Sequence, residues 1–365
     1  MTSFDWRELY AQNQSAIRAS GVALPSLPAT ATAPGLTHGA GVRVPALAAG
    51  ATLPAVGEWR TFTVGGRVRR ALVYVPEGIG VDTPAPLVCM LHGCTQDPET
   101  FAAATRIAAA ADRHGFVAVL PGQERGDNAM RCWNWFEPQQ RSRGRGEPAA
   151  LVGIVGQMLG ETEPRIDPGR VFVCGLSSGG AMAAILAATY PDVFAAAAIH
   201  SGLAYGSASD VSSAYAAMAN GAPDAAAQGR AAYAAMGRHA RAVPTIVVHG
   251  SADRTVAPVN AHQVLEQTMT ANRLAAPDCR MLQPDRPATV VAGHADGGLA
   301  YTRSRWNDLR GNLVHELVLV DGLGHAWSGG LPGGSYTDPR GPDATDAIAR
   351  FFAETVTGAT PAAGC

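Results

Sequence analysis

A serine flanked by glycines, between an apolar run and an alanine-rich run, constrains this chain more than any other segment. Residues 171–174 are apolar and predict a buried strand, and residues 178–190 predict a helix. A serine on such a strand-to-helix turn is a nucleophile elbow, in which Gly175 and Gly179 are needed because a Cβ at either position would clash with the crowded chain. The pattern predicts Ser177 as an exposed nucleophile at the end of a sheet.

The adjacent Ser178 is a competing nucleophile. Its neighbours two positions away are Leu176 and Gly180, so only Ser177 has the paired glycines. A Gly-x-Ser-x-Gly turn can also be an ordinary loop between a strand and a helix. The prediction therefore depends on whether the rest of the chain offers a base and an acid.

Strand-like and helix-like segments alternate along most of the 365 residues. Two alternating runs at 59–64 and 70–76 flank a Gly-Gly pair and predict a β-hairpin. Further strands are predicted at 87–91, 116–120, 171–174, 194–199, 245–249 and 313–320, and helices at 100–112, 149–159, 178–190, 259–271 and 343–354. The alternation predicts an α/β fold with a mostly parallel central sheet and helices on both faces. Residues 207–240 interrupt this alternation of strands and helices. They are predicted to form either a lid over the site or a pair of surface helices.

Three regions are expected from composition. Residues 1–58 read as a short helix at 5–20 followed by an Ala- and Pro-rich linker or strap, residues 59–357 as the catalytic domain, and residues 358–365 as a tail. The first residues lack a basic stretch followed by an apolar one, and no run approaches about 20 apolar residues. We therefore expect no membrane span and a cytoplasmic location, with a secreted form as the alternative.

Charge and cysteine spacing limit the classes of partner. The net charge is −2 with only 16% charged residues, which argues against a nucleic-acid partner. The six cysteines show no Cys-x-x-Cys spacing, so a metal site is not expected. Cys89 and Cys174 lie within apolar runs and are interpreted as small core residues. No metal and no organic cofactor is predicted.

A serine alcohol needs a base that is oriented by a third group. Asp253 follows the strand at 245–249 through a glycine turn, and His325 follows the strand at 313–320 through a second one. The chain order of serine, acid and histidine is that of α/β-hydrolases. Asp321 remains the alternative acid. The alternative bases are His200, His249 and His294.

The strand at 87–91 ends in His-Gly, and the loop that follows supplies an oxyanion donor in such folds. We assign this role to the backbone N–H of Cys94, together with that of Ser178. Cys132 lies in an aromatic run, and whether it bonds to Cys94 is left open.

Trp133 and Trp135 are separated by one polar residue. On an extended segment they would point the same way and form an apolar platform beside the oxyanion loop. The alternative is that both are core residues, since large aromatic side chains are highly buried on average.

Four motifs together resemble the poly(3-hydroxybutyrate) depolymerase family of esterases. They are His-Gly-Cys-Thr-Gln at 92–96, Arg-Cys-Trp-Asn-Trp-Phe at 131–136, Gly-Leu-Ser-Ser-Gly-Gly-Ala-Met at 175–182 and Gly-His-Ala-Trp-Ser-Gly-Gly at 324–330. The resemblance runs from about residue 59 to 352. It implies an α/β-hydrolase domain with Ser177, Asp253 and His325 as a catalytic triad acting on short-chain 3-hydroxyacyl esters.

The resemblance also shapes the expected substrate. Feruloyl and acetylxylan esterases belong to the same superfamily and are the alternative activities. Secreted members carry a signal peptide and a C-terminal substrate-binding module, neither of which is recognisable here, so an intracellular enzyme associated with polymer granules or their oligomers is expected. Trp133, Trp135 and Trp327 are the predicted substrate-binding residues. A catalytically idle granule-binding protein is the alternative of a different class.

Overall fold

The computed structural model describes residues 56–79, 83–276 and 287–357, and all that follows concerns these residues. The helix expected at 5–20 and the tail at 358–365 lie outside them, as does the linker up to residue 55. None of the described helices is both long and apolar enough to cross a bilayer.

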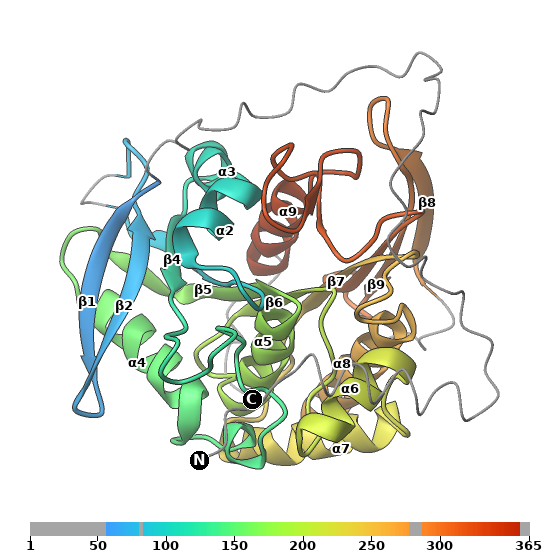
Figure 1. Ribbon diagram of the computed structural model, residues 1–365, viewed down its shortest axis with the longest axis horizontal. Helices are drawn as coiled ribbons and strands as arrows, with labels where there is room; N and C mark the ends of the chain where they lie inside the picture. The colour runs from blue at the N-terminus through green and yellow to red at the C-terminus, as the bar shows by residue number, and fades with distance from the viewer. Residues whose placement is uncertain (1–55, 80–82, 277–286, 358–365) are drawn as a thin grey trace, which may run out of the picture. The chain divides into compact units, whose positions relative to one another are not determined.

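A ten-stranded sheet organises the described residues, in the order β1-β2-β4-β3-β5-β6-β7-β10-β9-β8 (Figure 1). The six central strands pair in parallel. They are β3 (Ala85–Leu91), β4 (Val117–Pro121), β5 (Ile166–Leu176), β6 (Ala196–His200), β7 (Thr245–Gly250) and β10 (Leu313–Val320). This arrangement confirms the predicted mostly parallel sheet.

An antiparallel hairpin lies at each edge of the sheet. The predicted one joins β1 (Glu58–Val64) to β2 (Arg67–Tyr74), and its two turn glycines both have positive φ, 56° and 75°. Positive φ at both central residues matches the twist of the strands. The other, β8 (Thr289–His294) with β9 (Ala300–Asn307), was not predicted, because β8 is mostly exposed and shows no alternation of apolar and polar residues.

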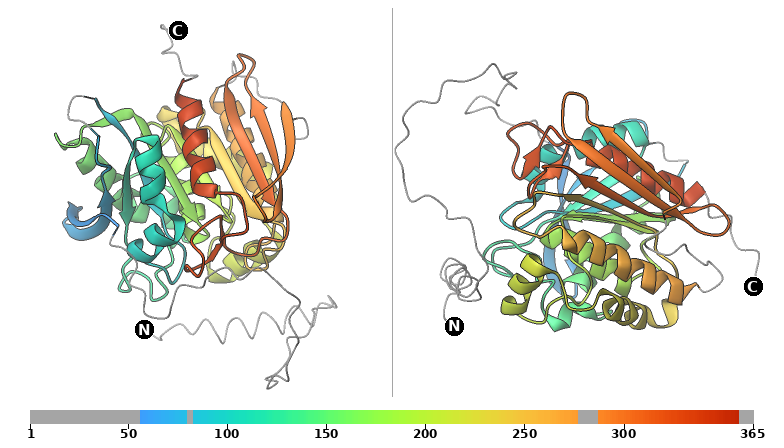
Figure 2. Two further views of the ribbon diagram at one scale, coloured as in Figure 1. Left: turned by 90° about the horizontal axis from the view of Figure 1, so that it is seen from above. Right: turned by 90° about the vertical axis from the view of Figure 1, so that its right-hand side faces the viewer.

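Helices cover both faces of the sheet (Figure 2). One face carries α2 (Pro98–Thr105), α3 (Ile107–His114) and α9 (Ala344–Thr357), and the other carries α4 (Gly146–Leu159), α5 (Ser178–Thr189) and α8 (Val259–Ala275). Each face has its own apolar core. The helix expected at 100–112 is two helices, because Arg106 between them has a left-handed φ of 56°.

The segment at 207–240 forms α6 (Val211–Asn220) and α7 (Ala225–Met236), followed by a 3-10 turn at Gly237–His239. Asn260 of α8 donates its Nδ2–H to the carbonyl of Ala217 on α6 at 3.0 Å. A Cβ added to Gly229 of α7 would lie 2.5 Å from the Cβ of Thr270 on α8, so α7 and α8 pack backbone to side chain. The segment therefore forms two helices, α6 and α7, that pack against α8.

Candidate active site

Ser177 forms the turn between β5 and α5. Its backbone adopts φ 56° and ψ −117°, a conformation that non-glycine residues rarely take. A Cβ added to Gly175 would lie 2.4 Å from the carbonyl carbon of Gly179, and one added to Gly179 would lie 2.2 Å from the carbonyl oxygen of Leu91. Both distances are far inside van der Waals contact. The crowding predicted for the nucleophile elbow is confirmed.

Asp253 and His325 meet at the ends of two neighbouring parallel strands, β7 and β10. His325 Nδ1 lies 2.8 Å from Asp253 Oδ2, and the other carboxylate oxygen accepts the backbone N–H groups of Thr255 and Val256, each at 2.9 Å. An ionised carboxylate accepts hydrogen bonds only, so the imidazole carries its proton on Nδ1. This leaves His325 Nε2 as an acceptor.

The environment of Asp253 keeps it ionised. The residue is buried, and burial alone would raise its pKa, but the hydrogen bonds from His325 and the backbone of Val256 outweigh that effect and lower the pKa. The acid is therefore negatively charged at neutral pH, as a group that orients an imidazole must be. Asp321, the alternative acid, is exposed and its backbone N–H bonds to Ala300.

Two of the alternative bases, His200 and His249, are buried, and the third, His294, lies on an edge strand of the sheet. The His200 ring is fully buried, accepts the N–H of Ser328 at 3.1 Å and stacks on Trp327. Buried His249 lies 2.8 Å from the carbonyl of Val256 and 3.5 Å from Asp253 Oδ2, the oxygen that His325 contacts at 2.8 Å. Burial lowers the pKa of both imidazoles. His294 ends the edge strand β8, three positions along the sheet from β7.

The loop after β3 lies against the serine. A Cβ added to Gly93 would be 3.6 Å from Ser177 Cβ. Among the described residues, the backbone N–H groups of Cys94 and Ser178 have no hydrogen-bond acceptor, whereas the neighbouring N–H of Thr95 bonds to the carbonyl of Met130 at 2.6 Å. The two groups assigned as oxyanion donors are thus unpartnered, on segments that lie beside Ser177.

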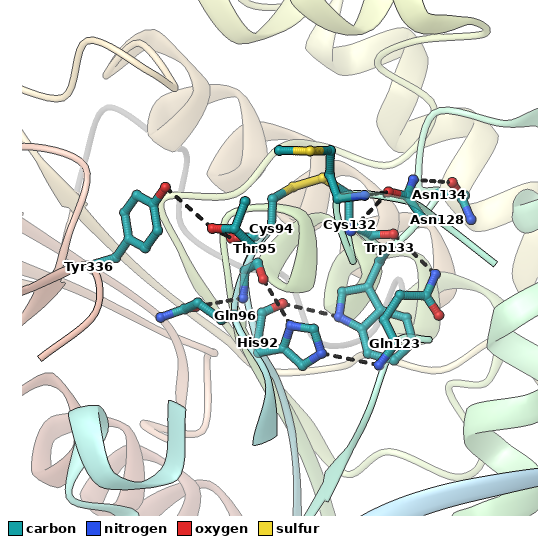
Figure 3. The surroundings of a disulfide bond; sticks show 12 residues. His92, Cys94, Thr95, Gln96, Gln123, Asn128, Cys132, Trp133, Asn134 and Tyr336 are labelled. Atoms are coloured by element: carbon teal, nitrogen blue, oxygen red, sulfur yellow. Dashed lines mark hydrogen bonds between the residues drawn. A yellow bond between two sulfur atoms is a disulfide. The ribbon is translucent and has the colours of Figure 1, made fainter. Parts of the chain in front are cut away.

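A disulfide joins Cys94 to Cys132, with 4.2 Å between the two Cα atoms (Figure 3). This answers the question that the sequence left open. The loop carrying Cys132 is itself ordered by Asn128, whose Oδ1 accepts the N–H groups of Met130 and Cys132 at 2.9 and 3.2 Å. The oxyanion loop is therefore cross-linked to a second, internally bonded loop.

Glu147 of α4, which was not predicted as a site residue, holds that second loop through hydrogen bonds to Asn134. Its carboxylate accepts the N–H and Nδ2–H of Asn134 at 2.8 and 2.6 Å and the Nε2–H of Gln123 at 2.5 Å. Burial raises the pKa of Glu147 to about 7, although these hydrogen bonds oppose the shift. Gln123 in turn donates its backbone N–H to His92 Nε2 at 3.2 Å, which ties the anchor to the oxyanion loop.

The predicted tryptophan platform is wrong. Trp133, Trp135 and Trp327 have exposed fractions of only 3%, 7% and 1%. Trp133 donates its Nε1–H to the carbonyl of His92, and Trp327 donates its own to Thr345 Oγ1. The three rings are core residues, which is the alternative weighed for the first two. They brace the loops of the site instead of facing a substrate.

An aromatic residue that the sequence analysis missed does face solvent here. Tyr336 is 46% exposed, and its ring centroid lies 6.2 Å from that of His325. Its hydroxyl is 3.5 Å from Thr95 Oγ1 in the oxyanion loop (Figure 3). The only sequence signal is a tyrosine in the Gly-rich stretch that follows the histidine motif.

The two free cysteines of the described residues lie in the core of the sheet. Cys89 and Cys174 are free and buried in the core, as expected, and burial raises the pKa of the Cys89 thiol to about 12. Within residues 56–79, 83–276 and 287–357, no group of three or more His, Cys, Asp or Glu side chains is placed to hold a metal ion.

Comparison with known families gives a match to the model described as "Esterase PHB depolymerase", over residues 70–299. This is more than half of the chain. It contains Ser177, Asp253 and the oxyanion loop, and it ends before His325.

Individual proteins are similar over parts of the chain. The poly(3-hydroxyalkanoate) depolymerase C of Paucimonas lemoignei is 41% identical over 69% of this chain and 57% of its own length. Feruloyl esterase B of Neurospora crassa is 34% identical over 37% of this chain and 44% of its own length. The chain thus spans about half the length of these relatives. The structure of an acetyl xylan esterase from Aspergillus awamori superposes with a TM-score of 0.62 at 20% identity, covering 81% of this chain and 99% of that one, a likeness of fold.

Proposed function

Because the chain belongs to the PHB depolymerase family of esterases, we propose that it is a serine esterase that hydrolyses short-chain 3-hydroxyacyl esters, with poly(3-hydroxybutyrate) or its oligomers as substrate. The observation that carries the proposal is the hydrogen bond between His325 and the buried Asp253, in a chain that also holds Ser177 in the strained elbow turn. A serine, an oriented imidazole and an ionised acid are the groups that acyl transfer requires.

The reaction proceeds through an acyl-enzyme. His325 Nε2 takes the proton of Ser177 Oγ, and the oxygen attacks the ester carbonyl. Asp253 holds the Nδ1–H tautomer and stabilises the imidazolium that forms. The imidazolium then gives its proton to the departing alcohol. Water, activated by the same base, releases the acid and restores the serine.

The negative charge of the tetrahedral intermediate is held by backbone N–H groups. We assign the two donors to Cys94 and Ser178, the second of which begins α5 and so adds the positive end of the helix dipole. Their lack of other acceptors among the described residues supports the assignment. Removing one such donor typically slows catalysis by about 10²- to 10³-fold.

Two other substrate classes are the alternatives. Relatives named feruloyl esterase and acetylxylan esterase favour a carbohydrate ester. The higher identity and the wider coverage of the depolymerase relative favour the polyester. The non-catalytic granule-binding alternative is not supported by the Asp253–His325 pair, which a binding surface does not need.

The test compares four substrates with one enzyme preparation: p-nitrophenyl butyrate, 3-hydroxybutyrate trimer, amorphous poly(3-hydroxybutyrate) and methyl ferulate. Ser177→Ala serves as the inactive control. Hydrolysis of the trimer and the polymer at rates well above that of methyl ferulate supports the proposal. A preference for methyl ferulate would support the carbohydrate-esterase alternative. If none of the four esters is hydrolysed, the non-catalytic granule-binding alternative is supported.

The cellular location is proposed from the disulfide. Disulfides form and persist in oxidising compartments and are rare in the cytoplasm. The Cys94–Cys132 bond therefore favours an exported enzyme over the cytoplasmic, granule-associated one expected from the first residues, and polymer outside the cytoplasm as its substrate. Mass spectrometry of the linked peptides, together with cell fractionation, tests this: reduced Cys94 and Cys132 in a cytoplasmic, granule-bound pool would contradict it.

A further inference from the structure

We infer that Tyr336 binds the alcohol portion of the ester, on the leaving-group side of the scissile bond. The inference rests on the proposed function and names a specificity residue for it. Tyr336 lies immediately before the two-residue strand β12 (Thr337–Asp338), which pairs with β11 (Trp327–Ser328) just after the catalytic histidine.

The ring stands between the base and the oxyanion loop. Its plane is at 78° to that of the His325 imidazole, with 6.2 Å between centroids, which is an edge-on contact. Its hydroxyl reaches Thr95 Oγ1, next to Cys94, at 3.5 Å. In Figure 3, Tyr336 points toward Thr95 from one side of the oxyanion loop, and Cys132 lies on the other side of that loop.

The backbone around Tyr336 is fixed from several directions. Its carbonyl accepts the N–H of Trp327 at 2.7 Å, and the carbonyl of the preceding Ser335 accepts the Nε2–H of Gln96 at 2.9 Å. Gln96 also accepts the N–H of Gly93 through its Oε1 at 2.9 Å. The Gln96 side chain thus links the Tyr336 segment to the oxyanion loop.

Packing does not explain why a tyrosine occupies this position. Tyr336 has a φ of 50°, in the left-handed region that is unfavourable for a bulky side chain. The residue is nevertheless 46% exposed, so burial offsets little of the cost of this backbone conformation. Strained residues held by an over-determined surrounding structure cluster at functional sites. A large aromatic ring held rigidly in solvent beside a base fits a substrate contact.

The chemistry of acylation places the alcohol at this ring. His325 Nε2 must give its proton to the alcohol oxygen, which requires an approach to about 3 Å. Whatever is bonded to that oxygen then lies near the imidazole, and the Tyr336 ring has its centroid 6.2 Å from that of the imidazole. In a polyester the group is the next hydroxyacyl unit, whose methyl and methylene groups suit an aromatic surface. The acyl portion, bonded to Ser177, extends away from the departing oxygen.

The experiment varies the alcohol at constant acyl group and the acyl group at constant alcohol. Methyl butyrate and the butyryl ester of methyl 3-hydroxybutyrate form the first pair, and methyl acetate with methyl butyrate forms the second. Both butyryl esters give the same acyl-enzyme, so kcat/KM reports the step in which the alcohol is still present.

Three variants are compared by kcat/KM and melting temperature. Tyr336→Asn removes the ring and suits the left-handed backbone, because asparagine tolerates positive φ. Tyr336→Phe keeps the ring. Tyr233→Ala is the matched control, since Tyr233 is a tyrosine of α7 that is 37% exposed and is not among the residues assigned to the site.

We expect Tyr336→Asn to lower kcat/KM for the larger alcohol relative to methyl butyrate by roughly 3- to 10-fold, the value of one aromatic contact. The acyl pair should keep its wild-type ratio, Tyr336→Phe should restore the alcohol preference, and Tyr233→Ala should change neither ratio. Equal losses on both butyryl esters, or a changed acyl ratio, overturn the inference. If the wild type hydrolyses butyryl esters but no hydroxybutyrate oligomer, the proposed polyester substrate fails while the alcohol ratio still decides the role of Tyr336.

Discussion

Ser177 donates its backbone N–H to the carbonyl oxygen of His200 over 2.9 Å, which ties the elbow to the end of the neighbouring strand β6. The bond belongs to the main chain, so it does not depend on the serine side chain. The strained φ at Ser177 is held by this bond and by the glycine packing around it. The position of the nucleophile is therefore a property of the fold and survives removal of the hydroxyl.

For this reason Ser177→Ala should abolish ester hydrolysis while leaving the protein folded. We expect a loss of about 10⁴-fold or more in kcat with p-nitrophenyl butyrate, the usual consequence of removing a triad serine. The melting temperature should stay close to that of the wild type. Ser178→Ala is the matched control, because the buried Ser178 contributes its N–H and not its hydroxyl. If Ser178→Ala were inactive and Ser177→Ala stayed active, Ser178 and not Ser177 would be the nucleophile.

Asp253→Asn should be far more damaging than Asp321→Asn. An amide at position 253 can donate to Nδ1 and favour the wrong tautomer of His325, which typically costs about 10⁴-fold in kcat. Asp321 is exposed and does not contact the histidine, so its variant should stay within about twofold of the wild type. Rates at saturating substrate decide the matter, and equal rates for the two variants would mean that the acid is misassigned.

Breaking the Cys94–Cys132 disulfide should reduce both stability and turnover. The bond closes a loop across a sequence separation of 38 residues, for which the chain-entropy model gives about 3–4 kcal/mol of unfolding free energy. Turnover should fall as well, by up to about 10²-fold, because the Cys94 N–H loses its fixed position beside Ser177.

The measurement is urea unfolding with kcat for Cys94→Ala and Cys132→Ala separately. Both variants remove the same bond, so the proposal requires matching losses. If Cys94→Ala alone lost activity, its thiol and not the cross-link would be responsible.

Stability should fall as the pH drops from about 6.5 to 4.5. Burial holds the pKa of His92 at about 4 and those of His200 and His315 at about 3, so unfolding exposes three imidazoles of ordinary pKa that then bind protons. Glu147 acts in the opposite direction, because its folded pKa of about 7 makes the native state bind a proton that the unfolded state has released. The net uptake of roughly two protons predicts a loss of roughly 2–3 kcal/mol per pH unit near pH 5.5.

Urea unfolding between pH 4.5 and 7 measures this slope. Glu147→Gln supplies the check on sign, since removing the opposing group should make the slope steeper whatever the variant does to absolute stability. A flat profile for the wild type would contradict the assignment of the buried imidazoles as neutral.

Local pattern was enough to predict much of this molecule. The elbow depends on Gly175, Ser177 and Gly179 within five residues, and the parallel strands are short apolar runs. Both features can therefore be predicted from local sequence alone. Asp253 and His325 followed from a rule that places functional loops at the carboxyl ends of strands. Their hydrogen bond is what the structure adds.

The features that the sequence did not reveal depend on distant neighbours. β8 forms because β9 offers it an edge, not because of its own pattern. Alternation in Trp133 and Trp135 indicated a shared direction and could not show that the direction was inward, toward the carbonyl of His92. Glu147 and Tyr336 acquire their roles only when loops far apart in the sequence come together.

The position of β10 has a consequence for synthesis of the chain. β10 pairs with β7 on one side and with β9 on the other. Because β8 and β9 precede β10 in the sequence, their hairpin is translated before the strand that joins it to β7. Until residue 320 leaves the ribosome, β7 presents an open edge of unpaired backbone groups, the kind of surface that aggregates or recruits chaperones. Ribosome-bound chains arrested on either side of that residue should therefore differ sharply in protease resistance, and the chain should complete its sheet and acquire His325 within one short interval of translation.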